Sequence, residues 1–369
     1  MRITHAVENL NRGGLERVVI DLASAQAAAG HDCQVVCLFE AGTLAPELTA
    51  RGVRVIACDK RDGADARALW RLRRALAAQR AEILHSHNDT PHYYAMVAAL
   101  GLGLRRVVNT RHGMGAGSPA NRRERLFRQS MRLADVSVAV SEAAGRRLAD
   151  AGLVPARKIR VLPNGIHPGP FRPREPRLRE QLATSLGLPP ETRLVGFVGR
   201  LNWAKDLSTM VAAFAQVRAQ RDDVALLLGG EGEERTGIEA AIADAGIGDR
   251  VFLLGDRSDV PALLPAFSIF AMSSVSEGYS IALLEACASA LPIVATRIGG
   301  NGEIVTDGVN GLVVPPSDPD ALAAALMQLL GDPGLADRMG RAGRAWLLEN
   351  ATFDVMASRY LDLYASGTG

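Results

Sequence analysis

The chain has 369 residues, of which 48% are hydrophobic and 22% charged, the composition of a soluble globular protein long enough for two domains. No apolar run approaches the length of a membrane span, and residues 1–7 are too short and polar for a signal peptide, so we expect a cytoplasmic protein. The net charge of +2 conceals a basic first part and an acidic second part.

Charge is divided unevenly along the chain. Residues 1–170 carry 25 Lys and Arg against 15 Asp and Glu, a balance of +10, whereas residues 171–369 carry the remaining 17 and 25, a balance of −8. Halves of opposite sign indicate two domains, or a basic half that faces a phosphate, an acidic acceptor or an anionic membrane. The basic half has no nucleic-acid-binding motif and little aromatic interleaving, so no nucleic acid is expected as a partner.

Short apolar strands alternate with helices in the first half, which predicts a parallel sheet with helices on both faces. The expected strands are 2–7, 34–39, 53–57, 83–86, 106–110, 136–140 and 159–162. The expected helices between them include 15–29, 66–80 and 120–133. The cysteines show neither Cys-x-x-Cys nor zinc spacing, which favours reduced buried thiols at all four positions, Cys33, Cys37, Cys58 and Cys287.

The same alternation restarts after a segment with five prolines, 163–176, which we interpret as part of a linker. The strands expected there are 194–198, 224–228, 251–254, 268–272 and 293–295. The helices expected there are 207–220, 236–245, 259–264, 280–289, 321–330 and 353–364. The fold class is therefore α/β, with two doubly wound domains in tandem whose strand ends meet at a shared cleft. The expected boundaries are 1–165, a linker 166–190, 191–350 and a C-terminal helix 351–369.

Glu277 and Glu285 bracket the expected junction between a strand and a helix. Eight residues are close to two helical turns, and the amides of the first helical turn have no intrahelical partner and attract phosphate. Two carboxylates on either side of a phosphate site can accept hydrogen bonds from hydroxyl groups. A sugar nucleotide has hydroxyl groups on both sides of its diphosphate, on the sugar and on the ribose. The neighbours of Glu285 are apolar, so we expect it to be buried and in need of a partner. The alternative is a loop glutamate and a glutamate on a solvated helix face.

Two cations follow the first strand of the second half. Arg200 and Lys205 suit a diphosphate leaving group, since Arg binds oxygens as a fork and Lys adds a point charge. The glycine-rich turn 229–232, which includes Gly230, allows a nucleotide to approach, and a nucleobase would lie on the backbone near Arg257. A surface Arg and Lys, and a simple tight turn, remain the alternatives. In the first half Gly13 and Gly14 precede a helix but do not form a dinucleotide-binding Gly-x-Gly-x-x-Gly motif.

Together these motifs resemble the retaining glycosyltransferase family 4, and the resemblance covers nearly the whole chain. It rests in the second half on Gly199-Arg200-Leu201 with Lys205, the turn 229–232, the Glu-x7-Glu motif of Glu277 and Glu285, and the segments 299–305 and 308–316. In the first half it rests on Gly13-Gly14, His112 after a strand, 140–142 and 163–166. The family has the GT-B fold, so the resemblance implies two Rossmann-like domains facing across a cleft, with the C-terminal helix returning to the first domain.

The resemblance also implies roles for individual residues. Arg200 and Lys205 would hold the donor diphosphate, with Gly14 closing from the opposite domain. Glu285 would bind the ribose, and His112 would lie by the reacting carbon. Glu277 and the backbone near Tyr279 and Ser280 would contact the donor sugar. The amides of Ile281 and Ala282 would bind the phosphate. His87 and Asn164 are the candidates for acceptor contact.

Two departures from the family pattern are visible. His167 stands where the family usually has Asp after Asn-Gly-Ile/Val, and Tyr279-Ser280 stands where many members have Phe-Gly. The first puts any role of that position in doubt, and the second is expected to alter the preference for the donor sugar.

The function expected from this resemblance is transfer of a hexose, with retention, from a nucleoside-diphosphate sugar to a hydroxyl of a glycan or lipid-linked acceptor, in bacterial polysaccharide or glycolipid biosynthesis. Basic residues would replace a metal. The alternatives are a GT-B-fold sugar-nucleotide epimerase and a non-catalytic nucleotide-sugar-binding protein. A serine hydrolase built on Ser280 is excluded because no histidine follows it in the chain.

Three further signals have competing interpretations. The segment Arg122–Arg132 carries five arginines interleaved with Leu126, Phe127 and Met131, so it is either a basic helix on an anionic membrane or a solvated helix packed on the core. The Asp-x-Asp pair Asp318 and Asp320 precedes a helix, which favours capping over a divalent-ion site. His85 and His87 end a strand, but no third ligand with matching spacing appears, so no metal site is expected and either acceptor contact or simple packing is favoured.

Overall fold

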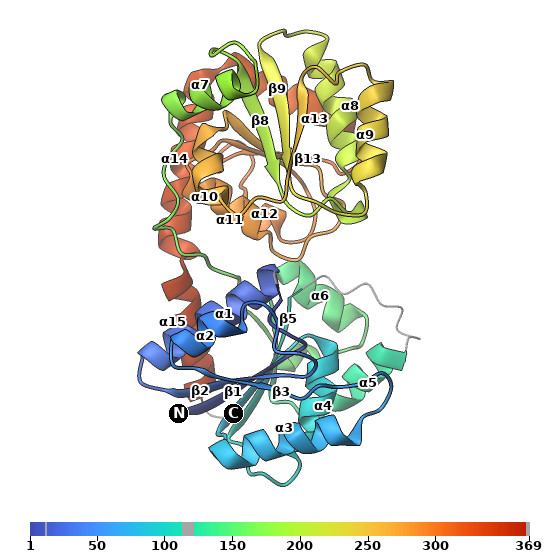
Figure 1. The fold of residues 1–369 in the computed structure, drawn as a ribbon, viewed down its shortest axis with the longest axis vertical. Helices are drawn as coiled ribbons and strands as arrows, with labels where there is room; N and C mark the ends of the chain where they lie inside the picture. The colour runs from blue at the N-terminus through green and yellow to red at the C-terminus, as the bar shows by residue number, and fades with distance from the viewer. Residues whose placement is uncertain (12, 113–121, 367–369) are drawn as a thin grey trace. The chain divides into compact units, whose positions relative to one another are not determined.

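The computed structural model describes residues 1–11, 13–112 and 122–366, which form two compact units (Figure 1). The first unit contains Met1–Asn164 together with the C-terminal segment that starts at Asp354. The second unit is Gly165–Phe353. Each unit is built on a parallel sheet, as the alternation of strands and helices predicts.

The sheet of the first unit has seven parallel strands in the order β3-β2-β1-β4-β5-β6-β7. All residues of β1 and β2 except the first are buried, because helices cover both faces of a parallel sheet. The strands are β1 Arg2–Val7, β2 Asp32–Cys37, β3 Arg54–Ala57, β4 Ile83–His87, β5 Arg106–Arg111, β6 Val136–Ala139 and β7 Ile159–Val161.

Helices alternate with these strands. Asp65 caps α3 by accepting hydrogen bonds from the backbone N–H groups of Arg67 and Ala68, and Ser141 caps α6 through the N–H of Ala144. The helices are α1 Gly14–Ala28, α2 Ala45–Ala50, α3 Ala66–Gln79, α4 Asp89–Ala99, α5 Arg122–Ser130, α6 Glu142–Asp150 and the 3₁₀ turn η1 Ala156–Lys158. Residues 120 and 121 of the expected helix 120–133 lie outside the described residues.

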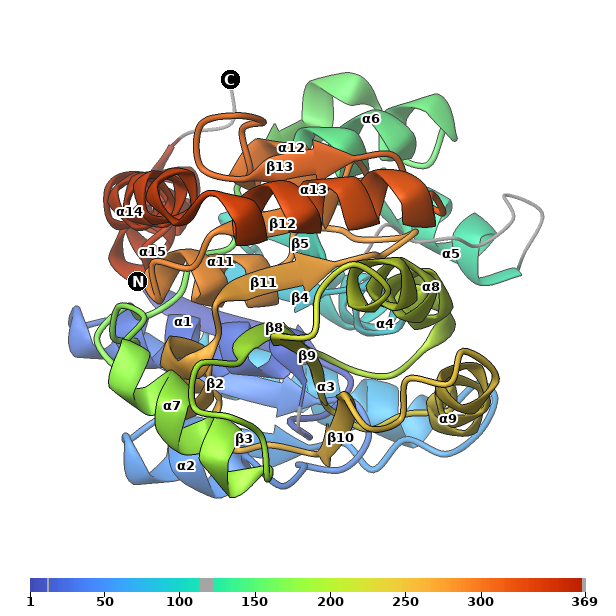
Figure 2. The same cartoon turned by 90° about the horizontal axis from the view of Figure 1, so that it is seen from above.

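The sheet of the second unit has six parallel strands in the order β10-β9-β8-β11-β12-β13, which Figure 2 shows from above. Gly196 in β8 is required by packing, since a Cβ there would lie 2.0 Å from the ring of Phe267. The strands are β8 Arg193–Val198, β9 Val224–Gly229, β10 Val251–Gly255, β11 Ile269–Met272, β12 Ile293–Thr296 and β13 Leu312–Val314.

Two helices of the second unit lie in segments where the sequence analysis placed none. Helix α7 lies within the expected linker 166–190, which belongs to the second unit. Helix α14 packs on α11, where a Cβ at Gly340 would lie 2.1 Å from the carbonyl oxygen of Ala290. The helices are α7 Pro176–Ser185, η2 Trp203–Lys205, α8 Leu207–Arg218, α9 Arg235–Asp244, α10 Val260–Leu263, η3 Leu264–Ala266, α11 Ile281–Ala288, α12 Asn301–Ile304, α13 Pro319–Gly331 and α14 Pro333–Asn350.

Two smaller expectations from the sequence are confirmed. Asp318 caps α13, accepting a hydrogen bond of 2.9 Å from the N–H of Ala321, while Asp320 accepts one from Gln216. All four cysteines are free and buried. Burial raises the thiol pKa at each of the four, to about 12 for Cys287, so these thiols are unreactive packing groups.

The last helix, α15 Phe353–Ala365, completes the core of the first unit from Asp354 onward, as expected, and Figure 1 shows it in red beside the blue elements. Tyr360 and Tyr364 are at most 1% exposed. The Tyr364 hydroxyl lies 2.6 Å from Nδ1 of His85, and the Tyr360 hydroxyl lies 3.1 Å from Oγ1 of Thr110. Arg105 also donates to the backbone oxygen of Tyr364 at 2.8 Å.

In both sheets the strand order reverses, between β1 and β4 in the first and between β8 and β11 in the second. The loops that leave such neighbouring strands diverge to opposite faces of the sheet, and open α/β sheets bind ligands at the crevice this creates. The residues expected to be functional are therefore sought at these strand ends.

We predict that Tyr364→Ala destabilises the first unit by about 3–5 kcal/mol, because it removes a buried ring and leaves His85 without its hydroxyl partner. The buried thiols provide the measurement, since alkylation of Cys33, Cys37 and Cys58 in urea reports unfolding of the first unit and alkylation of Cys287 reports unfolding of the second. The midpoint for the first three thiols should fall, and that for Cys287 should stay. The exposed substitution Asp362→Ala is the control, and equal shifts for both units would contradict the assignment.

Candidate active site

The loop after β11 is tied to the turn after β8 by an ion pair. Lys205, the last residue of η2, bonds through Nζ to Oε1 of Glu277, and their side chains are 17% and 11% exposed. The Ser274 hydroxyl donates to the same carboxylate oxygen at 2.8 Å. The Ser273 hydroxyl also donates to the backbone oxygen of Lys205 at 2.8 Å. Two residues expected to hold different parts of the donor therefore meet at one point.

A glycine turn at residues 299–300 packs against the backbone of this loop. Gly299 has φ of +48°, and a Cβ there would lie 1.8 Å from the carbonyl oxygen of Glu277. The N–H of Gly300 donates to the carbonyl oxygen of Gly278 at 3.0 Å. Only glycine permits both the left-handed conformation and this close approach, so the backbone that carries Glu277 is fixed.

Helix α11 starts directly after the loop. Ser280 is its N-cap, and its hydroxyl accepts a hydrogen bond of 3.4 Å from the N–H of Leu283. This leaves the N–H groups of Ile281 and Ala282 at the start of the helix for a ligand. The side chains of Tyr279 and Ser280 are buried, which agrees with the expectation that this segment would contact a ligand through its backbone.

Glu285 lies one helical turn into α11, between buried apolar neighbours. Among the described residues none donates a hydrogen bond to its carboxyl group. Burial without a compensating donor raises the pKa of Glu285 to about 7. The sequence indicated a buried carboxyl that needs a partner; in the structure the residue is half-buried, and no described protein group donates a hydrogen bond to its carboxyl group.

A cavity of about 260 Å³ lies at the carboxyl ends of β8, β9 and β10. It brings Arg200, the glycine turn and Arg257 together, as the sequence suggested; its lining is Val198, Gly199, Arg200, Gly229, Gly230, Glu231, Asp256 and Arg257. Gly230 has φ of +139°, and a Cβ there would lie 1.9 Å from the carbonyl oxygen of Gly199. The cavity wall at Gly199 and Gly230 is therefore bare backbone, which suits a flat ring.

The two arginines of this cavity differ. Arg257 is held by Asp259 through hydrogen bonds of 2.7 and 2.6 Å, which lower the pKa of the Asp259 carboxyl. Arg200 is exposed and forms no ion pair with another described residue. A larger cavity of about 460 Å³, which includes Arg193 and Ile269, lies at the opposite ends of β8 and β11 and is separate from these residues.

In the first unit a row of histidines crosses the ends of β1, β4 and β5. Nε2 of His112 lies 2.9 Å from Nδ1 of His87, and the N–H of His112 donates to Oδ1 of Asn88 at 3.1 Å. Asn88 has φ of +61° and ψ of −166°, a strained conformation for a residue other than glycine. Such strain is common at functional sites, and here it sits next to the histidine expected to meet the reacting carbon.

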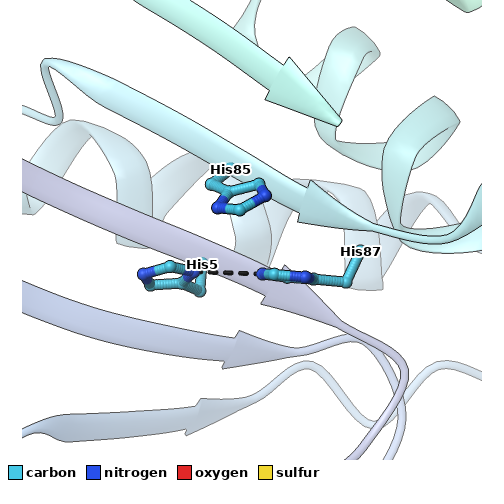
Figure 3. Close-up of side chains that lie close together, drawn as sticks. All are labelled: His5, His85 and His87. Atoms are coloured by element: carbon cyan, nitrogen blue, oxygen red, sulfur yellow. Dashed lines mark hydrogen bonds between the residues drawn. The ribbon is translucent and has the colours of Figure 1, made fainter. Parts of the chain in front are cut away.

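Figure 3 shows the rest of this row, His5 from β1 with His85 and His87 from β4. One ring nitrogen of each lies within 4.8 Å of the others, a spacing that suits a metal ion. The third histidine was not found from the sequence because it is brought in by strand pairing, which places His5 beside His85. All six ring nitrogens of the three nevertheless have hydrogen-bond partners.

The position of His87 does not fit the expected contact with the acceptor. Its side chain is 1% exposed, and its two nitrogens are bonded to His5 and His112. These contacts fit packing, the other interpretation of the histidines at the end of β4, and they place His87 as a partner of His112.

The remaining residues singled out from the sequence, Gly14 and Asn164 in the first unit and His167 in the second, occupy separate places. Gly14 is exposed at the start of α1. Asn164 is buried with an Oδ1 that has no hydrogen-bond partner. His167, which departs from the family pattern, stacks on Phe353 with the ring centroids 4.3 Å apart.

Helix α5 has a basic outer face. Phe127 and Met131 are buried, and the only acid of the helix, Glu124, is turned inward to a bidentate pair with Arg111. The exposed side chains of 122–133 include Arg122, Arg123, Arg125, Leu126, Arg128, Arg132 and Leu133. No helix of the described residues is both long and apolar enough to cross a bilayer.

Comparison with protein families gives two matches that cover both halves of the chain. A model described as Glycosyltransferase Family 4 matches residues 12–169, and one described as Glycosyl transferases group 1 matches residues 179–346.

Among characterised relatives, the GDP-mannose-dependent alpha-(1-6)-phosphatidylinositol monomannoside mannosyltransferase of Mycolicibacterium smegmatis is 30% identical over 306 residues, 78% of this chain and 79% of that protein. The N-acetyl-alpha-D-glucosaminyl L-malate synthase of Bacillus anthracis is 29% identical over 290 residues, 77% of this chain and 74% of that protein.

Among solved structures, Anabaena HepE in complex with UDP has a TM-score of 0.86 at 20% identity, covering 98% of this chain and 99% of that chain. HepE has also been solved in complex with UDP-glucose. These matches confirm the resemblance on which the sequence analysis relied. The chain belongs to glycosyltransferase family 4, has the GT-B fold and is a glycosyltransferase.

Proposed function

We propose that the protein transfers a hexose from a nucleoside-diphosphate sugar, with retention of configuration and without a metal, to a hydroxyl of a glycan or lipid-linked acceptor. The observation that carries this proposal is the layout of α11, which has free amides in its first turn and the unpartnered carboxyl of Glu285 one turn further on. Amides at a helix N-terminus suit a diphosphate, and an acceptor-only carboxylate suits the hydroxyls of a ribose.

The contacts around α11 support roles for its neighbours. Lys205 follows β8, Glu277 follows β11, and their side chains form an ion pair. The cation can therefore neutralise the diphosphate while the carboxylate accepts a hydrogen bond from a sugar hydroxyl. Arg200, unpaired at the rim of the 260 Å³ cavity, adds a second cation, and the backbone at Gly230 is the platform for the base. Cations in these places can take over the charge stabilisation that a divalent ion would supply.

Retention is what the family resemblance implies, and the contacts of Glu277 bear on how it would be achieved. Its carboxylate already accepts from Lys205 and Ser274, which makes it a weak nucleophile, and Glu285 is assigned to the ribose. We therefore infer attack by the acceptor hydroxyl on the same face as the leaving group. The bond from the sugar carbon to the diphosphate oxygen breaks, the bond to the acceptor oxygen forms, and the acceptor proton passes to the departing phosphate.

The acceptor side of the proposal rests on the relatives and on the basic face. One relative is named for a phosphatidylinositol monomannoside, and another for transfer in lipopolysaccharide core biosynthesis. Helix α5 and the turn that follows it expose five arginines and two leucines, and α4, which packs on α5, exposes Val97. We propose that this face binds an anionic membrane and brings the enzyme to a lipid-linked acceptor in glycolipid or polysaccharide biosynthesis.

The first prediction concerns the donor. In a panel of UDP-, GDP- and ADP-sugars with EDTA present, wild type should bind and transfer from one donor. Glu285→Ala should weaken binding of that donor at least tenfold, since hydrogen bonds to a charged group contribute about 1.5–3 kcal/mol. The exposed Glu349→Ala serves as control. Isothermal titration calorimetry gives the affinities, and the anomeric proton coupling of the product gives the stereochemistry.

Three results would contradict this donor assignment. These are the absence of nucleotide-sugar binding by wild type, binding by Glu285→Ala as tight as that by Glu349→Ala, and loss of transfer in EDTA. Conversion of the donor sugar to its epimer without an acceptor would support the epimerase alternative. An inverted product would refute the same-face mechanism alone.

Donor binding should be coupled to proton release from Glu285. Its pKa of about 7 in the free protein means that the carboxyl is mostly protonated at pH 6, whereas ribose hydroxyls favour the carboxylate and lower its pKa in the complex. Affinity for a nucleotide sugar should therefore rise about tenfold from pH 6 to pH 8 and then level off. The diphosphate of a nucleotide sugar has no group that titrates in this range. Titrations in buffers of different ionisation enthalpy count the released protons, and Glu285→Gln should abolish the release.

Membrane binding is tested with vesicles. Wild type should bind vesicles of anionic phosphatidylglycerol in a salt-dependent way and bind neutral phosphatidylcholine vesicles weakly. Replacing Arg122, Arg125 and Arg128 by Gln should weaken binding on the order of 100-fold, at about 1 kcal/mol per arginine. The matched control replaces three exposed arginines elsewhere in the unit, Arg146, Arg147 and Arg157. Equal losses in both triple variants, or no loss in either, would show that α5 is not the docking face.

A further inference from the structure

Three histidines and a glutamine form one continuous hydrogen-bonded row inside the first unit. Oε1 of Gln26 lies 2.8 Å from Nε2 of His5, Nδ1 of His5 lies 3.0 Å from Nε2 of His87, and Nδ1 of His87 lies 2.9 Å from Nε2 of His112. Figure 3 shows the central link, with the rings of His5 and His87 nearly in line. The row runs from α1 through β1 and β4 to the end of β5.

The histidines of this row are neutral. Gln26 and His5 are 0% exposed and His87 is 1% exposed. Burial lowers the pKa of His5 and of His112 to about 4 and lowers the pKa of His87 well below its usual value. Each ring therefore carries one proton at neutral pH, and each link between rings needs one donor and one acceptor.

The glutamine gives the row a direction. Its Oε1 only accepts, so Nε2 of His5 must donate, which leaves Nδ1 of His5 as an acceptor. Nε2 of His87 then donates and its Nδ1 accepts, so Nε2 of His112 donates in turn. At the end of the row Nδ1 of His112 carries a lone pair, and it is a buried atom with no hydrogen-bond partner among the described residues.

Two contacts on its other side favour this orientation of Gln26. Its amide nitrogen lies 3.4 Å from the Tyr364 hydroxyl, and the Cys33 thiol, a weak donor, lies 4.0 Å from Oε1. In this arrangement Tyr364 donates to Nδ1 of His85 at 2.6 Å, and Nε2 of His85 donates to Thr110. If the amide were turned round, every proton in the row would move to the other nitrogen, and His112 would present a donor at Nδ1.

We propose that Gln26, His5 and His87 are positioning residues that hold His112 in the Nε2–H tautomer, so that its Nδ1 is a standing hydrogen-bond acceptor for a hydroxyl of the bound sugar. The assignment of a sugar to this place rests on the proposed function. The tautomer itself rests only on the row and is measurable without any ligand.

The metal-ion interpretation of the same histidines is less consistent with these contacts. A metal bound by His5, His85 and His87 would have to replace the hydrogen bond between His5 and His87 and one of the two hydrogen bonds of His85. The row satisfies the same nitrogens as they stand, so it accounts for the cluster without displacing any contact.

The first test is the tautomeric state in the full-length, ligand-free protein labelled with ¹⁵N-histidine. Long-range ¹H–¹⁵N correlation spectra at pH 7 should show His5, His87 and His112 neutral and protonated at Nε2. A proton on Nδ1 of His112, a charged ring in the row, or metal-shifted nitrogens together with stoichiometric metal in the purified protein would each overturn the proposal.

The second test uses two buried glutamines as a matched pair. Gln26→Met removes the acceptor that directs the row, whereas Gln79→Met removes hydrogen bonds of similar burial to Thr4 and Ile3 that do not touch the histidines. Gln26→Met should give mixed tautomers at His112 and lower kcat/KM about fivefold, the effect of one neutral hydrogen bond. Gln79→Met should change neither. Equal effects of the two variants, or unmixed tautomers in Gln26→Met, would overturn the proposal.

Failure of this inference and failure of the proposed function can be told apart. Donor binding at Glu285 is measured in the second unit and does not depend on the tautomer of His112. A wrong tautomer with intact donor binding rejects the row alone. The expected tautomer with no binding of any nucleotide sugar rejects the proposed function and leaves the row as a structural finding.

Discussion

The ion pair between Lys205 and Glu277 joins two loops that leave neighbouring strands at the point where the order of the second sheet reverses. Loops that leave the strands at such a reversal diverge unless contacts join them, and here the ion pair acts with two hydrogen bonds, from the Ser273 hydroxyl to the backbone oxygen of Lys205 and from the N–H of Val275 to the carbonyl oxygen of Ala204. The glycine turn at 299–300 packs against the same loop, and Ser280 begins α11 directly after it. The free amides, the sugar-side carboxylate and the diphosphate-side cation thus take their positions from this one set of contacts.

The two units differ in how the polar groups of their candidate sites are hydrogen-bonded. In the second unit Glu285 is left without a donor, so the protein bears a destabilising group that a ligand can satisfy. In the first unit the buried histidines satisfy one another and stay neutral, and only the last nitrogen of the row is left open. In the second unit a carboxyl group and in the first unit a ring nitrogen are thus left for a ligand, and the surrounding contacts hold each in place.

Much of this fold follows from sequence pattern because strands of a parallel sheet are short apolar runs closed by turn residues. Strand β1 matches its expected range 2–7, and Glu277 and Glu285 lie on the loop and helix where the pattern puts them. Helix α14 was missed because Gly340 and Gly343, which lower helix propensity, are needed for its close packing on α11. His5 was missed because register, which places it beside His85, is set by tertiary pairing and leaves no mark on spacing.

The place of α15 has a consequence for how the protein is made. The core of the first unit contains Tyr360 and Tyr364, which follow the whole of the second unit in the chain. At 5–20 residues per second, ribosomes need roughly 10–40 s to make the residues that intervene. During that time the first unit lacks the helix whose tyrosines contact His85 and Thr110. Its core can therefore be completed only after the whole second unit has been synthesised.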